Sequence, residues 1–543
     1  MIRIALAQFD FPVGDVQANV RKALDAVGEA RAAGADLLLF PEMALTGYPP
    51  EDLLLRPSFL AACEAAMERL AAEVRGIDVV IGHPWRQDGG LRNAVSWLRD
   101  GRVLGRYAKQ RLPNYRVYDE QRYFTSGSQP LVVELRGLPI GVIICEDAWA
   151  PEPSRQAREA GAELLLIANA SPYRDDKFAD REAMFAARYR ETGLPMVYCN
   201  LVGGQDELVF DGRSMLLDGA GRLSAPAPLC QEQLLLADFD PQSGALEARD
   251  WAGAPSDLLE EIYTVLCTGL RDYVRKNGFS DVVFGLSGGI DSSLTLALAV
   301  DALGAGRVHT VMMPSRYTSG ISIELAQEQA VQLRVDHRCI SIEPAFEALL
   351  QLLEASFAGS EADVTEENLQ ARVRGDIVMA LSNKFGWLPL ATGNKSEMAV
   401  GYSTIYGDMC GGFAPLLDCL KTRVYELARY RNGVSAVIPE AAITRPPSAE
   451  LRHEQSDQDS LPPYEILDRV LQRYVEQDWP IGRIVAEEGF DEGMVRRVAA
   501  LVLRNEYKRR QAAPGVRVTR RAFGRDRRYP ITSGWREPLP GGP

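Results

Sequence analysis

The chain has 543 residues, too many for a single hydrophobic core, and this length predicts two or three domains. Its composition, 46% hydrophobic and 25% charged, is typical of a globular protein rather than a disordered or fibrous one. A formal net charge of −14 argues against general nucleic-acid binding, because neutralising phosphates requires a basic face.

Neither the N-terminus nor the cysteines suggest export. Residues 1–8 alternate in polarity as a strand does, and no apolar run approaches the ~20 residues that a membrane helix needs. The eight cysteines lack CxxC spacing, which argues against both a disulfide framework and a zinc site. We therefore expect a cytoplasmic protein with no membrane partner.

Residues 1 to about 240 alternate short apolar runs with periodic, helix-like stretches. The two clearest helix-like stretches are residues 20–33 and 60–74. This alternation predicts an α/β domain whose central β-layers are covered by helices. The strands are predicted at residues 2–7, 37–40, 78–82, 140–145, 164–168 and 196–200.

A stretch rich in proline and glycine, residues 240–255, is the best linker candidate. We place the two domains at residues 1–245 and 258–543, with a linker at residues 246–257. The second domain opens with a predicted helix at residues 258–277. A second βαβ series follows, and it predicts a doubly wound parallel sheet. Its strands are predicted at residues 281–284, 307–313, 336–340 and 388–392.

The most informative motif is Gly-Leu-Ser-Gly-Gly-Ile-Asp-Ser-Ser at residues 285–293, between an apolar strand and a helical stretch. Small residues at such a turn leave backbone N–H groups unpaired, and the helix dipole favours an anion there, so the motif predicts a phosphate site. Ser287, Ser292 and Ser293 add hydroxyl donors. Asp291 is suited to holding a Mg²⁺ ion that bridges to phosphate. The Gly-Lys-Ser/Thr ending of a Walker loop is missing.

This motif resembles the SGGxDS loop of enzymes that split ATP between its α and β phosphates to adenylate a substrate. The resemblance implies ATP as co-substrate and assigns ATP contacts to the whole loop. The residues are Gly285, Leu286, Ser287, Gly288, Gly289, Ile290, Asp291, Ser292 and Ser293.

Three reactive residues of the first half lie at or after the ends of predicted strands, where loops often present catalytic groups. They are Glu42, Lys109 and Cys145. A thiol followed by acidic Glu146 and Asp147 is a poor thiolate unless a base and a cation are brought to it. Glu42 and Lys109 can supply both. Taken singly, the cysteine also fits a buried apolar position, and the two charged residues fit an exposed surface.

Together these segments resemble the nitrilase or amidase superfamily, which uses a Glu-Lys-Cys triad on a four-layer αββα sandwich. The resemblance implies that Cys145 attacks a carboxamide carbon and that Glu42 transfers the thiol proton to the departing ammonia. It implies that Lys109 stabilises the oxyanion, and that Glu120 holds Lys109 in place. Glutamine-using members hold the amino-acid end of the substrate at positions matched here by Tyr115, Ser171 and Lys177, with Arg181 a weaker candidate for the carboxylate.

The second half resembles the NAD synthetases, nearly to the C-terminus. Five segments carry the resemblance behind the ATP loop, namely residues 313–317, 368–372, 392–397, 421–428 and 445–451. The resemblance implies a Mg²⁺ ion held by Asp291 and Glu397 on the ATP phosphates. Further contacts are implied to ATP or pyrophosphate from Thr392, Lys421 and Ser448, and to the deamido-NAD substrate from Asn368, Arg372, Glu397 and Lys508.

The C-terminal segment, residues 508–528, is strongly basic inside an acidic protein. Two readings remain open from composition: a solvated charged tail, or a clamp for an anionic small substrate.

The whole chain thus resembles the glutamine-dependent NAD synthetases. This implies that ammonia is released from glutamine in one domain and channelled to a deamido-NAD adenylate in the other, in a homo-oligomer. Another amidotransferase with the same ATP loop, such as GMP or asparagine synthetase, is an alternative, although their glutaminase domains lack the Glu-Lys-Cys pattern. A degenerate nucleotide sensor is a second alternative, but a sensor needs neither the thiol nor its partners.

Overall fold

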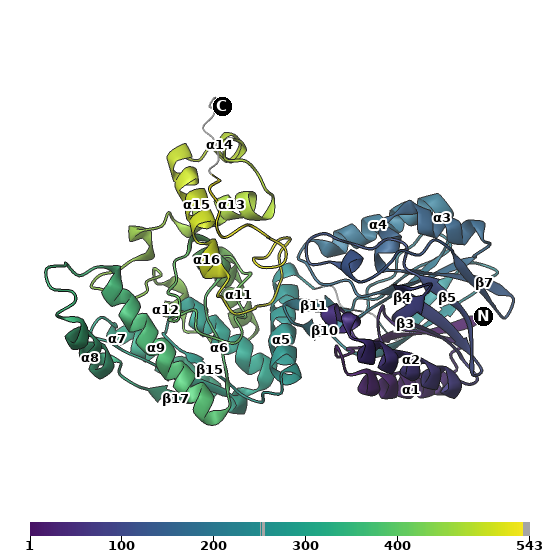
Figure 1. Cartoon of the computed structure of the whole chain (residues 1–543), viewed down its shortest axis with the longest axis horizontal. Coiled ribbons are helices and arrows are strands. Elements are labelled where there is room, and N and C mark those ends of the chain that lie inside the picture. The colour runs from purple at the N-terminus through teal and green to yellow at the C-terminus, as the bar shows by residue number, and fades with distance from the viewer. Residues whose placement is uncertain (250, 252, 254–255, 536–543) are drawn as a thin grey trace. The chain divides into compact units, whose positions relative to one another are not determined.

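A computed structural model describes residues 1–249, 251, 253 and 256–535 (Figure 1). The chain divides into two compact units, Met1–Ser256 and Asp257–Pro543. Four positions of the expected linker, residues 250, 252, 254 and 255, lie outside the described residues, as do residues 536–543 of the expected second domain. The two units are treated separately below.

The first unit contains two large sheets and a small hairpin. The larger sheet has the order β14-β13-β1-β2-β3-β4-β5, the second has the order β12-β9-β8-β7-β6, and β10 pairs with β11. The strands are β1 (Ile2–Gln8), β2 (Leu37–Leu39), β3 (Asp78–Gln87), β4 (Gly90–Arg99), β5 (Arg102–Ala108), β6 (Leu131–Leu135), β7 (Leu138–Ile144), β8 (Leu164–Asn169), β9 (Met196–Asn200), β10 (Val202–Gln205), β11 (Leu208–Asp211), β12 (Met215–Leu217), β13 (Gln233–Phe239) and β14 (Leu246–Arg249).

The described part of the first unit also contains the α-helices α1 (Val16–Ala32), α2 (Pro57–Glu73), α3 (Pro151–Glu159) and α4 (Lys177–Thr192). Figure 1 shows α1 and α2 on one side of the strands and α3 and α4 on the other. Each pair packs together, with α2 against β3 and α3 against β7. The unit is therefore the four-layer αββα sandwich that the resemblance implies.

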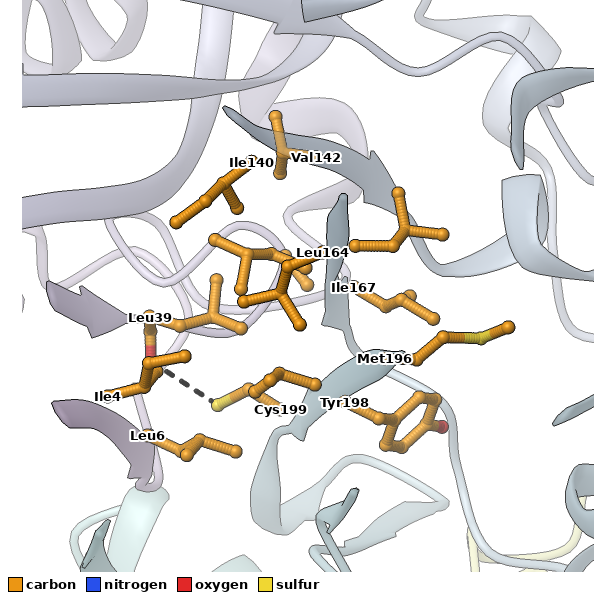
Figure 2. Packing of buried hydrophobic residues seen from close by; sticks show 14 of the residues in the cluster. Ile4, Leu6, Leu39, Ile140, Val142, Leu164, Ile167, Met196, Tyr198 and Cys199 are labelled. Carbon is orange, nitrogen blue, oxygen red and sulfur yellow. Dashed lines mark hydrogen bonds between the residues drawn. The ribbon is translucent and has the colours of Figure 1, made fainter. Parts of the chain in front are cut away.

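The inner faces of the two sheets meet in one apolar layer. Ile4, Leu6 and Leu39 of the larger sheet face Ile167 and Cys199 of the smaller one (Figure 2). The Cys199 thiol donates a hydrogen bond across this layer to the Leu39 carbonyl, with 3.4 Å between sulfur and oxygen. The central parallel strands β7, β8 and β9 are buried on both faces, so they appear in the sequence as continuous apolar runs.

The first unit extends further than the predicted domain boundary. Residues 246–249, which we assigned to the linker, form strand β14 and pair antiparallel with β13 from Leu236 to Phe239. The assignment was wrong there because Pro241 and Gly244 mark a hairpin turn rather than the end of the domain. In this turn the Gly244 N–H donates to the Asp240 carbonyl over 2.8 Å.

The second unit is built on a parallel sheet with the order β17-β16-β15-β18. Its strands are β15 (Val282–Gly285), β16 (Val308–Met312), β17 (Asp336–Cys339) and β18 (Leu388–Pro389). Helix α6 (Ile290–Leu303) connects β15 to β16, and α7 (Gly320–Leu333) connects β16 to β17. The chain then crosses to the opposite edge through α8 (Glu343–Leu353) and α9 (Val364–Phe385), which gives the doubly wound arrangement.

The remaining helices surround this sheet. Helix α5 (Leu258–Lys276) begins after Asp257, whose carboxylate caps the helix by accepting from the Glu260 N–H over 2.8 Å. A separate apolar cluster joins α13, α14 and α15 to the end of α10. The other helices are α10 (Lys395–Val400), α11 (Lys421–Val434), α12 (Glu440–Thr444), α13 (Tyr464–Leu471), α14 (Ile481–Glu488), α15 (Glu492–Arg504) and α16 (Glu506–Arg509). Among the described residues, no helix is long and apolar enough to cross a membrane.

The layer between the two sheets predicts where substitutions are costly. Ile167→Ala removes a fully buried side chain from this layer, and we expect it to lower the free energy of unfolding of the first unit by about 3 kcal/mol. Leu104→Ala, on the same unit but 43% exposed, should change it by less than about 0.5 kcal/mol. Native-state hydrogen exchange of peptides from β7 to β9 measures both, and equal effects would contradict the assignment of this core.

Candidate active sites

The first unit places three buried charged residues in one network. Glu42 follows β2, Lys109 follows β5, and Glu120 begins a short 3₁₀ turn at Glu120–Arg122. The Lys109 ammonium lies 2.7 Å from Glu42 Oε1 and 2.7 Å from Glu120 Oε1, and all three side chains are at most 5% exposed. The backbone after Glu42 packs closely against Gly82 of β3. A Cβ at Gly82 would lie 2.2 Å from the Met43 nitrogen, so only glycine permits this approach.

Neighbouring polar groups fix the two carboxylates. Asn93 of β4 donates to Glu42 Oε1 over 2.6 Å, and Tyr48 donates to Glu120 Oε1 over 2.8 Å. The Ala170 N–H donates to the other Glu42 oxygen over 3.2 Å. Burial alone would lower the pKa of Lys109, but the two carboxylates raise it well above its ordinary value, so the ammonium stays charged.

Cys145 begins a 3₁₀ turn, Cys145–Trp149, directly after β7, and its φ of +43° is in the left-handed region that non-glycine residues seldom adopt. Burial, and then the charge of Glu42, raise the pKa of its thiol well above the ordinary value, and Lys109 opposes them. The thiol is therefore protonated at neutral pH and needs a base to become a nucleophile. The two largest charge effects on it come from Glu42 and Lys109 of the predicted triad, and Glu146 and Glu120 add smaller ones.

The three predicted glutamine contacts differ in their surroundings. Tyr115 is 49% exposed and donates to Glu146 over 2.9 Å, while Ser171 is buried and its N–H donates to Asn200 over 2.9 Å. Lys177 is the first residue of α4, and its ammonium lies 3.9 Å from the centre of the Trp149 ring. Burial, followed by the charges of nearby arginines, lowers the pKa of Lys177 to about 8.

Arg181 does not fit the role of a substrate contact. Its guanidinium is fully buried and pairs in a fork with both Asp211 oxygens, over 2.7 and 2.8 Å. A further N–H of Arg181 donates to the Ser171 carbonyl over 3.1 Å. These contacts use the side chain to hold the Ser171 segment, which the sequence pattern alone could not distinguish from ligand binding.

The second unit contains a cavity of about 460 Å³ at the carboxyl ends of β15 and β16. The loop at residues 285–292 lines it, whereas Ser293 lies buried in α6. Further lining comes from α9, α10 and α11 and from residues 445–451. The cavity lies at the carboxyl edge of the parallel sheet, where doubly wound folds bind ligands.

The loop after β15 is bonded within itself. The Ser287 N–H donates to the Ser292 hydroxyl over 3.2 Å, and that hydroxyl donates to the Gly289 carbonyl over 3.0 Å. Gly288 has φ of +77°, and a Cβ there would lie 2.2 Å from the Ser322 carbonyl oxygen. Only glycine fits this position, because both the backbone angle and the contact with α7 exclude a side chain.

Asp291 and Glu397 meet around one buried ammonium. Lys421 is 2% exposed and forms ion pairs with Asp291 and, over 3.0 Å, with Glu397. Asn394 donates to Asp291 Oδ1 over 2.9 Å. Burial raises the pKa of the Glu397 carboxyl above its ordinary value, although the charge of Lys421 acts in the opposite direction. Two cavity-lining carboxylates on neighbouring elements suit a hard cation that completes its shell with water and phosphate oxygens, so these residues fit Mg²⁺.

Four other predicted ligand contacts line the same cavity: Thr392, Ser448, Asn368 and Lys508. Ser448 donates its hydroxyl to the Gln455 carbonyl over 2.6 Å, and Asn368 accepts from Thr404 over 2.7 Å. The Lys508 ammonium donates to the carbonyls of Gly401 and Ser403, each over 2.8 Å. All four therefore lie on the lining, and contacts within the protein hold three of them in place, Ser448, Asn368 and Lys508.

Arg372 does not line this cavity. It is exposed on α9, and its Nε donates to the Ile405 carbonyl over 3.4 Å. Arg374, two residues further along the helix, lines the cavity, and its Nε donates to the Met313 carbonyl over 3.0 Å. Two residues correspond to about 200° around a helix, so the two side chains point to different surroundings.

The basic C-terminal segment does not fit the first reading made from composition, a solvated charged tail. Arg509, Arg517 and Arg527 are each under 9% exposed, so this segment is not a solvated tail. Arg517 pairs with Asp526 over 2.6 Å, and Arg509 and Arg527 both pair with Glu506, over 2.9 and 3.0 Å. These three arginines thus form ion pairs within the folded segment. Lys508 is the residue of this segment that lines the cavity.

Sequence reasoning missed several residues of both sites. Asn93, Tyr48 and Arg374 carry no local signal, because only the fold brings them to the network or the cavity. Asp147 did have a signal, its place two residues after Cys145, but it was interpreted as acidic charge that weakens a thiolate. In the structure its carboxylate is buried and accepts four hydrogen bonds from other groups.

Comparisons with known proteins agree with this geometry. The carbon-nitrogen hydrolase family model matches residues 3–247, and the NAD synthase family model matches residues 262–512. A glutamine-dependent NAD(+) synthetase of Xanthomonas campestris pv. campestris is 53% identical over 540 residues, covering 98% of each chain. One of Thermotoga maritima is 45% identical over 575 residues, covering 99% of this chain and all of its own.

A solved structure extends the likeness to three dimensions. The glutamine-dependent NAD+ synthetase of Acinetobacter baumannii, in complex with ADP, is 45% identical, covers 99% of this chain and 100% of its own, and superposes with a TM-score of 0.80. The four-layer sandwich, the doubly wound sheet and these full-length matches lead to one conclusion. The chain belongs to the family of glutamine-dependent NAD(+) synthetases.

Proposed function

We propose that Cys145, Glu42 and Lys109 release ammonia from glutamine in the first unit. One observation carries the proposal. The Lys109 ammonium is buried between the carboxylates of Glu42 and Glu120, and the charges of these three groups act on the protonated Cys145 thiol. Cys145 Sγ attacks the carboxamide carbon and its proton passes to Glu42, which then protonates the departing amine. Lys109 stabilises the oxyanion, and Glu120 holds Lys109. Water then cleaves the thioester to give glutamate.

Three residues near the thiol would bind the amino-acid end of glutamine. We propose Tyr115, Ser171 and Lys177 for this role, and the partly exposed Tyr115 hydroxyl and the lowered pKa of Lys177 support it. Lys177 would pair with the substrate carboxylate, because it is a half-buried cation beside the Trp149 ring, where the charge of Glu146 favours its protonated form.

In the second unit, we propose that the carboxylate of deamido-NAD attacks the α-phosphorus of ATP, with loss of pyrophosphate. Ammonia then attacks the resulting acyl-adenylate and displaces AMP to give NAD. Mg²⁺ held by Asp291 and Glu397 would neutralise charge on the ATP phosphates. The loop at residues 285–292 and Thr392 would hold ATP, with Lys421 and Ser448 meeting the pyrophosphate, whereas the predicted contact from Ser293 is not retained because its side chain is buried in α6.

For the dinucleotide, we propose contacts from Asn368, Glu397 and Lys508, which line the same cavity. Arg372 is exposed and off the lining. We propose that it reaches the dinucleotide bound to a second copy of the chain, in a homo-oligomer.

Substitution of the thiol tests the division of labour. Cys145→Ala should reduce glutamine-supported NAD synthesis below about 1% of wild type, because no other group can form the thioester. Ammonia-supported synthesis should remain largely intact. Cys199→Ala is a matched control, since Cys199 is also buried in the first unit but its thiol bonds the Leu39 carbonyl between the two sheets. Loss of both activities in folded Cys145→Ala would overturn the two-site proposal.

Substitution of the cation ligand tests the second site. Asp291→Asn should lower synthesis from either nitrogen source by at least about 100-fold, because adenylation precedes both. Asp301→Asn, on the same helix, removes a carboxylate that pairs with Arg431 and should leave both activities near wild type. Pyrophosphate release measured with glutamine and with ammonium separates the steps. Full ammonia-supported activity in Asp291→Asn would exclude a cation at this residue.

We also propose that the released ammonia reaches the adenylate without mixing with solvent. In neutral water it would become mostly ammonium, which has no lone pair for the attack, and open water would hydrolyse the adenylate. ¹⁵N-ammonium added during glutamine-driven turnover should therefore enter NAD only slightly. Substantial incorporation, at an ammonium concentration too low to support synthesis alone, would show that the ammonia escapes.

A further inference from the structure

Asp147 is a buried carboxylate that the proposed glutaminase chemistry does not use. It lies two residues after Cys145 and is fully buried. Both of its oxygens accept two hydrogen bonds. Oδ1 accepts from the N–H groups of Gln110 and Arg111 over 3.0 and 2.7 Å, and Oδ2 accepts from the Tyr107 hydroxyl and the Ile144 N–H over 2.8 and 3.2 Å.

These four donors lie on the two segments that carry the thiol and the ammonium. Tyr107 is in β5, and Gln110 and Arg111 follow Lys109 directly. Ile144 is the last residue of β7 and precedes Cys145. Strands β5 and β7 belong to different sheets of the sandwich. One carboxylate therefore connects the two sheets at the level of the proposed site and limits how far Lys109 and Cys145 can separate.

The backbone at Cys145 needs such support. Its φ of +43° is unfavourable for a residue with a side chain, and such conformations persist only where the surroundings fix them. The Asp147 carboxylate accepts from the N–H of Ile144, the residue before Cys145, and this hydrogen bond closes the turn that contains Cys145. Cys145, the residue with this unfavourable backbone angle, is also the residue whose sulfur must be oriented toward the substrate in the proposed reaction.

We propose that Asp147 is a positioning residue of the glutaminase reaction, which holds the Cys145 turn and the Lys109 segment at the separation that the chemistry requires. This inference rests on the proposed roles of Cys145 and Lys109. It predicts that loss of the carboxylate impairs the chemical step more than glutamine binding, because Asp147 faces the protein backbone rather than the substrate.

A purely structural role is the competing explanation, and Asp78 provides a matched control. Asp78 is 4% exposed in β3 and accepts from Trp97 Nε1 over 2.6 Å and from Arg99 over 2.6 and 2.7 Å. Its partners lie on the neighbouring strand β4 of the same sheet, so it makes a comparable set of buried bonds without joining the two catalytic segments.

The experiment compares Asp147→Asn with Asp78→Asn in the full-length chain. For Asp147→Asn we expect kcat for glutamine-supported synthesis to fall about 10- to 100-fold, since small displacements of reacting groups have effects of this size. KM for glutamine and the ammonia-supported rate should each change by less than about threefold. The alkylation rate of Cys145 by iodoacetamide, followed by mass spectrometry of its peptide, should fall in parallel. Asp78→Asn should leave the alkylation rate and kcat near wild type.

Two results would overturn the proposal: wild-type kcat and alkylation in folded Asp147→Asn, or equal losses in both variants. If Asp147→Asn does not fold, Tyr107→Phe carries the test, because it removes one donor and keeps the backbone bonds. A fall of more than about threefold in kcat at an unchanged melting temperature supports the proposal, and unchanged kcat contradicts it. The Cys145→Ala result is independent of this comparison, so failure of the proposed chemistry and failure of the positioning role can be distinguished.

Discussion

Both candidate sites depend on the same interaction, a buried lysine ammonium shared by two carboxylates. Lys109 and Lys421 are 1% and 2% exposed, and each forms ion pairs with two acids. Burying an isolated ammonium costs several kcal/mol, so these lysines can be charged inside the protein only because each has two partners. Lys395, paired with Asp418 and Glu476, repeats the arrangement away from the cavity lining.

The arrangement has different consequences in the two units. In the first, Lys109 and Asn93 share one Glu42 oxygen, and the other accepts only a backbone N–H among its described partners, so the two oxygens of this carboxylate have different surroundings. In the second, the acids that neutralise Lys421 are the ones that fit a divalent cation. The Mg²⁺ that we propose for these acids would therefore compete with the ammonium for the same oxygens.

The sequence predicted the parallel strands of both units well, in most cases because strands buried on both faces, such as β7 to β9, form continuous apolar runs. Strand β17, whose residues are exposed or half-buried, was predicted without such a run. Strand β9 has the predicted bounds, residues 196–200, and the other predicted strands agree within a few residues, apart from β3 and β18. The antiparallel strands β4, β5, β6 and β10 to β14 were missed. Their polar and apolar residues mix, as in β5, where Arg102 to Arg106 alternate between exposed and partly buried positions and only Tyr107 is buried.

The site residues divide in the same way. Residues in compact motifs, such as 285–293 and 145–147, could be found from local spacing, because one turn holds them together. Asn93 and Arg374 could not, since their relevance arises from contacts between segments far apart in the chain. The substrate contact considered for Arg181 and the solvated-tail reading of the C-terminus do not fit the structure, for one physical reason. A sequence gives the charge of a side chain but not the buried acid that already neutralises it.

The loop at residues 285–293 is ordered by hydrogen bonds within itself, and this order affects how tightly it can bind a phosphate. With Ser287, Ser292 and Gly289 bonded to one another and Gly288 pressed against the Ser322 carbonyl, the backbone already has the shape of a cradle. A flexible loop would lose conformational entropy when it closed on a phosphate, and that loss would weaken binding. Here the entropy is lost once, during folding, so the nucleotide that we propose for this loop would meet a surface that needs no reordering.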